Sequence, residues 1–288
     1  MLFRPLSSRI AVGRARVVRE VRAAAPLMAD LRAPVTARGP WLTAVLNEGA
    51  AHRSAGPWTP RPVAVVVEAH PQGRPEAVAF LTLRRRGPTT VVTLLGDGTT
   101  PLPPGRPFAR LLARNEESAR LLAAGITGLL DRLRGPWTLR LAGLPLGDPT
   151  ARELAAALPT AVLANVRSSR LVDELDTAVG VVRSTDPQAL ERWLPELLAR
   201  EPRARTRGFL RASARLHAAI GGLELAVVAD GVLRAALLTL VDGTDRWPWW
   251  GTSDIGGLRT EMGAPLVGLT VPARAWPRPP GFSRGGGR

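Results

Sequence analysis

The feature that most constrains the fold of this chain is a cluster of strand-like segments followed by alternating helices and strands. Apolar segments rich in Val, Thr and Leu lie at residues 62–68, 76–83 and 89–95. After them come a helical pattern at 115–134, a strand at 137–141, a short helix at 152–158 and a strand at 161–166. Strands followed by strand–helix alternation predict a mixed sheet with helices packed on it. The predicted fold class is therefore α+β.

The connections within the strand cluster specify how the strands pair. Residues 70–74 (HPQGR) and 84–88 (RRRGP) are compact and contain Pro and Gly, which favour tight turns. Short turns join neighbouring strands in opposite directions, so the three strands are predicted to form an antiparallel meander. The longer segment at 96–107 has no regular pattern. It lies between a strand end and a helix, where open α/β sheets commonly bind ligands, and this predicts a functional loop.

Length and composition limit the class of protein. A chain of 288 residues with 45% apolar residues can bury one large core or two modest ones. No apolar run reaches the roughly 18 residues of a membrane-spanning helix. The first 20 residues lack the apolar region of a secretory signal, so a cytoplasmic location is expected. Cysteine is absent, which excludes disulfides, thiolate catalysis and zinc–thiolate sites.

The net charge of +15 suggests nucleic-acid binding, but its origin weakens that interpretation. All 39 basic residues are Arg, Tyr is absent, and Ala, Gly and Pro abound. This bias is typical of a high-GC genome, as in many bacteria. We therefore expect nonspecific attachment to polyanions at low salt rather than specific recognition.

The N-terminal region is predicted to be helical. Residues 8–31 carry apolar side chains at helical spacing, which indicates a helix packed on the sheet, or alternatively a basic surface helix that contacts anionic lipid. A second helix is expected to begin at residues 40–46.

The second half of the chain repeats part of this outline. Helical patterns precede two apolar strands at 223–229 and 232–241, and Asp230-Gly231 between them is a strong hairpin signal. No helix follows this second meander, so the repeat is truncated. The predicted organisation is an N-terminal helical segment at 1–39, a first unit at 40–183, a second unit at 184–272 and a disordered tail at 273–288.

Over residues 40–272 this order of elements resembles the GNAT superfamily of N-acetyltransferases, and in particular its tandem, CelD-type branch. The resemblance implies an acyltransferase that binds acetyl-coenzyme A or another acyl-coenzyme A at the N-terminus of the helix near residue 115, without a metal. The family pattern is Arg or Gln, two residues, Gly, one residue, then Gly or Ala. Its nearest match runs from Arg114 to Ala119, with Glu117 in place of the first Gly. The implied coenzyme-binding residues are Arg110, Arg114, Asn115 and Ser118.

Other candidate residues follow from local chemistry. The three histidines do not stand at metal-ligand spacing, so no metal site is predicted. Glu68 and His70 at a strand end are candidate general bases, although a solvated strand end also explains them. Two sets are candidates for substrate or partner binding: the tryptophans Trp247, Trp249 and Trp250, and the arginines Arg207, Arg211 and Arg215. The tryptophans suit a core or a recognition surface equally, and Pro248 among them favours an edge strand or a loop. The arginines suit a solvated helix face or an anion site.

Three hypotheses of function follow. The chain is an acyl-coenzyme-A-dependent N-acyltransferase, active or decayed; or it is a non-catalytic binding or scaffold protein on the same fold, with a small-molecule or protein partner; or it binds nucleic acid nonspecifically through Arg.

Overall fold

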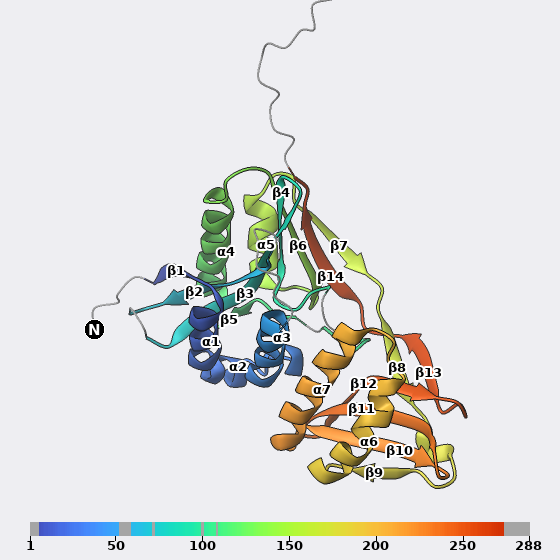
Figure 1. Cartoon of the computed structure of the whole chain (residues 1–288). Helices are drawn as coiled ribbons and strands as arrows, with labels where there is room; N and C mark the ends of the chain where they lie inside the picture. The colour runs from blue at the N-terminus through green and yellow to red at the C-terminus, as the bar shows by residue number, and fades with distance from the viewer. Residues whose placement is uncertain (1–5, 52–58, 71–72, 99–100, 108, 274–288) are drawn as a thin grey trace, which may run out of the picture.

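Two units built on separate sheets make up the structure, a computed structural model that describes residues 6–51, 59–70, 73–98, 101–107 and 109–273. The first unit has the larger sheet. In the sequence, the second unit is inserted between the last two strands of the first unit (Figure 1). Of the predicted tail at 273–288, only Ala273 belongs to the described residues.

The first unit is a mixed sheet in the order β1-β2-β3-β4-β6-β14-β7, with the short strand β5 paired to β3. Its strands are β1 (Ser7–Val12), β2 (Arg61–Glu68), β3 (Pro75–Arg86), β4 (Thr89–Leu94), β5 (Leu112–Ala113), β6 (Trp137–Leu144), β7 (Val162–Val166) and β14 (Leu266–Val271). The pair β4–β6 is parallel and the other pairs are antiparallel. The crossover between the parallel strands contains helix α4 (Glu116–Asp131).

Helices cover both faces of this sheet, which explains why β2 is apolar along its whole length (Figure 1). Side chains alternate between the faces of a strand. Val63, Val65 and Val67 pack with α4 and α5 (Pro149–Ala157). Ala64 and Val66 pack on the other face with α1 (Arg14–Ala23), α2 (Ala25–Asp30) and α3 (Gly39–Ala51), the last preceded by the 3-10 turn η1 (Val35–Ala37).

The second unit is a four-stranded antiparallel sheet in the order β12-β11-β10-β9, with two helices packed on it. Its elements are β9 (Val182–Ser184), α6 (Pro187–Ala199), α7 (Ala204–Ala219), β10 (Leu223–Ala229), β11 (Leu233–Asp242) and β12 (Asp245–Ser253). A separate ribbon of β8 (Ser169–Asp173) and β13 (Leu258–Met262), with the 3-10 turn η2 (Leu175–Thr177), joins this sheet to the first unit.

The tandem order of elements predicted from the sequence is present in the structure. Each unit begins with a strand, continues with helices and ends in a three-stranded meander, β2-β3-β4 in the first and β10-β11-β12 in the second. After β12 the chain passes only through β13 and β14 in its described part, so the second unit has no counterpart of α4. The α+β fold class, the first meander and the Asp230-Gly231 hairpin are confirmed. Pro248 lies in the edge strand β12, as expected.

The structure differs from two sequence predictions near the chain ends. Residues 8–31 are not helical from the start, because Ser7–Val12 pair with β2 as an edge strand before Gly13 turns the chain into α1. The unit boundaries also differ from 40–183 and 184–272. Strand β1 belongs to the first sheet, and so does β14, which lies between β6 and β7. Both strands pair with segments far away in sequence, which no local pattern records.

The two units share a hydrophobic core. Trp41 on α3 of the first unit packs edge-to-face against Phe209 on α7, with ring centroids 5.1 Å apart, and against Trp249 on β12 at 5.3 Å. Helix α3 thus contributes to the core of the second unit, and Figure 1 shows α3 and α7 side by side at the junction. The cleft described below lies where the two units meet.

Candidate functional site

The N-terminus of α4, where the resemblance places coenzyme binding, is occupied by its own side chains. Asn115 Oδ1 accepts a hydrogen bond from the Ser118 amide at 2.8 Å, and the Asn115 amide donates to Ser118 Oγ at 3.1 Å. This reciprocal capping box satisfies two of the amides that would otherwise be free to bind an anion. Glu116 and Glu117 add two carboxylates to the same turn. The terminus therefore does not fit the pyrophosphate of a coenzyme.

The two arginines predicted to assist this site have other partners. Arg114 lies between Asp30 and Glu76, at 3.1 and 2.9 Å, and so is neutralised by the first unit itself. Arg110 Nη1 donates to the Leu31 carbonyl at 2.5 Å. Of the four predicted coenzyme-binding residues, Asn115 and Ser118 cap the helix, Arg114 is held in ion pairs and Arg110 lines a different cavity.

The candidate general bases are not arranged for proton transfer. Glu68 is buried and accepts from Arg9 Nε at 2.8 Å, while the same guanidinium donates to both carboxylate oxygens of Glu20. These hydrogen bonds raise the pKa of Arg9, so it stays charged. His70 is exposed just beyond the end of β2. Glu68 is thus committed to an ion pair that fastens β1 and α1 to β2.

The tryptophan cluster is mainly part of the core. Trp249 is 3% exposed, and its Nε1 donates to the Pro101 carbonyl at 2.8 Å. Trp247 is buried as well, and the Arg106 guanidinium lies 5.1 Å from its ring centroid. Trp250 is half-buried and donates to Glu201 at 3.3 Å. Trp247 alone reaches the cavities described below.

The arginines on α7 do not converge on one point. Arg207 donates to the carbonyls of Glu201 and Pro202, at 2.8 and 2.9 Å, and so binds the segment that precedes α7. Arg215 forms a two-pronged pair with Glu191 on α6, which lowers the pKa of that carboxyl. Arg211 is exposed. The three arginines lie on a solvated helix face, from which Arg215 also links α7 to α6.

The segment between β4 and β5, residues 95–111, crosses to the second unit, and we call it the strap. Leu102 packs against the second core, and the Gly105 carbonyl accepts from the Ala264 amide at 2.9 Å. Gly105 has a φ of +88°, and a Cβ there would lie 2.1 Å from Cβ of Arg170. The segment predicted as a functional loop is therefore in close structural contact with both units.

A cavity of about 690 Å³ opens beside the strap, and we call it the inter-unit cleft. Its walls come from the end of α2, the strap, the turn from β6 into α5 and the turn from β11 into β12. Charged side chains on these walls are Arg32, Arg38, Arg106, Arg110, Asp148, Asp242 and Asp245. The cleft lies beyond the carboxyl end of β6, the side on which open α/β sheets bind ligands.

Two of the three cleft carboxylates are engaged. Asp242 receives two hydrogen bonds from Arg38, at 2.8 and 2.6 Å. Asp148 caps α5 by accepting from the Ala151 amide at 2.9 Å, and its burial raises the pKa of its carboxyl. Asp245 is more open and lies 3.4 Å from Arg106.

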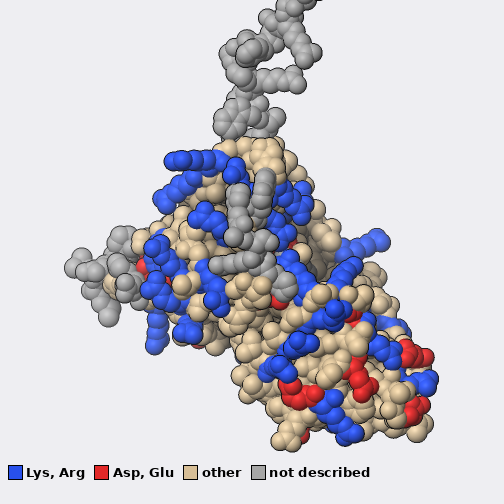
Figure 2. All heavy atoms as spheres, viewed as in Figure 1, with Lys and Arg blue, Asp and Glu red and all other residues tan. Residues whose placement is uncertain are grey.

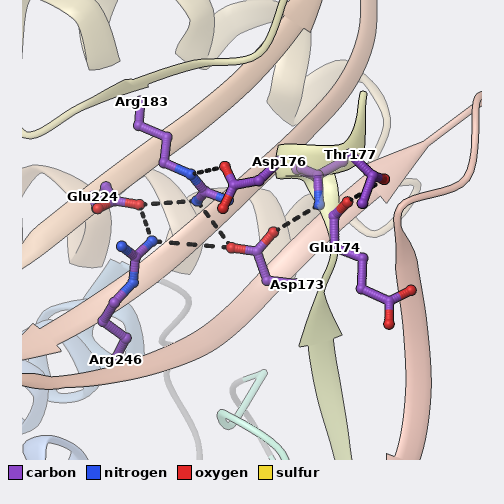
Figure 3. Close-up of polar contacts among 8 residues, drawn as sticks. Asp173, Glu174, Asp176, Thr177, Arg183, Glu224 and Arg246 are labelled. Atoms are coloured by element: carbon purple, nitrogen blue, oxygen red, sulfur yellow. Dashed lines mark hydrogen bonds and ion pairs between the residues drawn. The ribbon is translucent and has the colours of Figure 1, made fainter. Parts of the chain in front are cut away.

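A neighbouring cavity of about 630 Å³ shares Arg106 and Trp247 with the cleft. Figure 3 shows the charge network on its wall, in which Arg183 contacts Asp173, Asp176 and Glu224 at 2.9, 2.7 and 3.1 Å. Arg246 pairs with Glu224 as well. The hydrogen bond from Arg183 lowers the pKa of Asp176. These groups neutralise one another, so this wall offers little net charge to a ligand.

Sequence reasoning identified Arg110 and Trp247 but missed Arg32, Arg38, Arg106, Asp148, Asp242 and Asp245. Asp148 before Pro149 is a recognisable helix cap. Nothing local points to the others, because the cleft assembles from four distant segments. Among the residues that the structure describes, no group of His, Asp and Glu could hold a metal ion, and no helix is long and apolar enough to cross a membrane.

Comparison with known proteins gives a likeness to solved structures only. No protein-family model and no curated protein matches the chain. Among solved structures it is similar to a tandem GNAT protein from the clavulanic acid biosynthesis pathway, determined without acetyl-coenzyme A. The two share 16% identity, the match covers 92% of this chain and 98% of that chain, and the TM-score is 0.38.

Proposed function

We propose that this chain is a non-catalytic small-molecule-binding protein on a GNAT-like scaffold, and that the coenzyme site of that scaffold has been lost. The observation that carries the proposal is the capping box of Asn115 and Ser118 on α4. An anion at this terminus would have to break two hydrogen bonds and approach Glu116 and Glu117. Like-charge contact and lost hydrogen bonds both oppose binding.

Two further observations support a binding role. Neither Glu68, which is paired with Arg9, nor the exposed His70 is held where it could take a proton from a substrate in the cleft. The inter-unit cleft, in contrast, has the size of a small-molecule site and combines charged groups with an indole wall from Trp247.

Calorimetric titration with acetyl-coenzyme A tests the proposal. We expect no binding heat at high micromolar ligand, both for the wild type and for Arg114→Gln. In Asn115→Ala, loss of the side chain breaks the capping box and frees the Ser118 amide, so weak binding is expected to appear. Micromolar binding by the wild type that Arg114→Gln weakens would overturn the proposal.

Acyl transfer is the second candidate, and one observation favours it. The parallel pair β4–β6 places α4 between strands in the order that the resemblance implies. Release of free coenzyme A from acetyl-coenzyme A, with a panel of amines as acceptors, measures this activity. A rate above that of a buffer blank, abolished by heat denaturation of the protein, would favour this candidate.

Nucleic-acid binding through Arg is a third candidate with less support. On the face seen in Figure 2, arginines are spread over both units rather than gathered in one stripe, with acidic side chains among them on the second unit. A salt titration of binding to duplex DNA tests it. Attachment that fades by physiological salt for every sequence would be nonspecific.

A further inference from the structure

The inter-unit cleft has one property that its size does not explain: several of its guanidinium groups are unsatisfied. Arg38 is saturated, since it holds Asp242 through two nitrogens and the Ala33 carbonyl through its Nε at 2.6 Å. Arg110 uses one nitrogen, on Leu31. Arg106 has one loose ion pair at 3.4 Å, to Asp245, and stacks on Trp247. Arg32 forms no hydrogen bond or ion pair with any residue in the described part of the chain.

Two half-buried arginines outside the cleft, Arg9 and Arg183, are fully engaged. Arg9 donates three hydrogen bonds to two carboxylates, and Arg183 contacts three carboxylates. Guanidinium donors in a concave site are normally paired, because their desolvation is costly. Arg106 and Arg110 are half-buried and Arg32 is exposed at the rim, so an anion that enters the cavity meets free guanidinium donors on all three.

The backbone at Arg32 supports the same conclusion. Helix α2 ends in a Schellman motif, with the Ala33 amide bonded to the Met28 carbonyl at 2.8 Å and the Arg32 amide to the Ala29 carbonyl at 3.0 Å. Arg32 occupies the left-handed position of this motif, with φ of +46°, and is the one non-glycine residue with positive φ in the described chain. Glycine is the favoured residue there. Arginine at this position is therefore less favourable for the local backbone than glycine would be, yet it places a guanidinium group on the cleft.

The carboxylates of the cleft do not cancel this charge. Asp242 is neutralised by Arg38, and Asp148 is buried as the cap of α5. Asp245, and Asp148 through its attraction to Arg110, remain to offset Arg32, Arg106 and Arg110, so the four arginines and three aspartates of the cleft leave an excess of positive charge. Three guanidinium groups from two segments, the end of α2 and the strap, can surround a tetrahedral anion, which accepts several charge-assisted hydrogen bonds at once.

We propose that the inter-unit cleft binds the phosphate group of a small molecule, held by Arg32, Arg106 and Arg110, with the rest of the molecule against Trp247. This proposal rests on the proposed binding function and names the chemical class of its ligand. The site is separate from the N-terminus of α4, because its walls come from α2, the strap and the two turns.

The experiment is calorimetry on the full chain with three probes: ribose 5-phosphate, inorganic phosphate and citrate. Arg32→Gly is the central variant, and Arg211→Gln on the exposed face of α7 is its control for loss of one general positive charge. We expect Arg32→Gly and Arg106→Gln to weaken binding of the phosphate probes about tenfold or more, and Arg211→Gln to change it less than twofold. Tighter binding of ribose 5-phosphate than of inorganic phosphate identifies an ester as the ligand, and equal binding identifies free phosphate.

Arg32→Gly also carries its own folding control, because glycine relieves the positive φ. Its melting temperature should equal or exceed that of the wild type while binding is lost, so weaker binding cannot be attributed to unfolding. Equal weakening by Arg32→Gly and Arg211→Gln would overturn the site, and so would citrate binding as tightly as the phosphate probes. Failure of the proposed function would look different: acetyl-coenzyme A would bind, insensitive to Arg32→Gly and sensitive to Arg114→Gln.

Discussion

Arg38 and Asp242, 204 residues apart in sequence, form a two-pronged ion pair across the two units, with N–O distances of 2.8 and 2.6 Å. Arg38 directly precedes α3, and Asp242 ends β11. The pair therefore fixes the start of the shared helix relative to the second sheet at one wall of the inter-unit cleft.

The first prediction concerns this pair. Arg38→Gln is expected to lower the free energy of unfolding by about 1–2 kcal/mol, because it leaves a half-buried carboxylate without its partner. Urea denaturation monitored by tryptophan fluorescence measures the loss. Asp242→Asn in the Arg38→Gln background should add little further, since the interaction is already broken. Additive losses from the two substitutions would show that the pair is not coupled.

The second prediction concerns Trp249. Trp249→Ala should cost about 3–5 kcal/mol of stability, because it empties a space between Trp41, Phe209 and the strap. Trp250→Ala, at a half-buried position on the same strand, should cost clearly less. Denaturation midpoints compare the two. A Trp249→Ala protein as stable as the wild type would contradict the core role of this residue and favour a recognition surface.

The third prediction concerns the strap. Gly105→Ala should destabilise the protein by about 2–4 kcal/mol, because its methyl group would meet Arg170 at 2.1 Å and its φ is +88°. Gly98→Ala is the matched control, since φ there is +65° but nothing lies within 4 Å of the added Cβ. It should cost only about 1 kcal/mol. Equal losses of stability at the two positions would mean that Gly105 of the strap is not in close contact with Arg170 of the β8–β13 ribbon.

The fourth prediction is a pH dependence from Asp148. Burial raises the pKa of this carboxyl above its ordinary value of 3.8, so the folded state binds its proton more tightly than the unfolded state. Wild-type stability should therefore gain relative to Asp148→Asn as pH falls through the raised value toward 3.8, and the gain is lost as pH rises. Asparagine keeps the cap, so the difference isolates the charge. A difference in unfolding free energy that does not change with pH would contradict this assignment.

The sequence predicts the local parts of this fold well. The turns at 70–74 and 84–88 and the Asp230-Gly231 hairpin each join neighbouring strands, and turn chemistry alone specifies such pairing. The position of β14 between β6 and β7 could not be predicted, because about a hundred residues of the second unit separate it from its partners. Residues 7–12 pair with β2 in the same non-local way.

The candidate site was predictable only in part. The departure of Glu117 from the family pattern is visible in the sequence, and the structure adds the reciprocal bonds of Asn115 and Ser118. The cleft was not predictable, because Arg32, Arg106 and Asp242 come from segments that meet only after both units have formed. Arg110 was selected for the N-terminus of α4 and lies in the cleft instead.

The N-terminus of α4 is closed to anions, and its own backbone amides report most directly on whether a ligand can enter. The measurement is the chemical shift of the Glu117 and Ser118 amides, followed by NMR during titration with acetyl-coenzyme A. We expect no change in the chemical shifts of these amides up to high micromolar ligand. A saturable shift of the Ser118 amide at micromolar concentration would contradict it, because the coenzyme would then displace the Asn115 side chain and occupy the site.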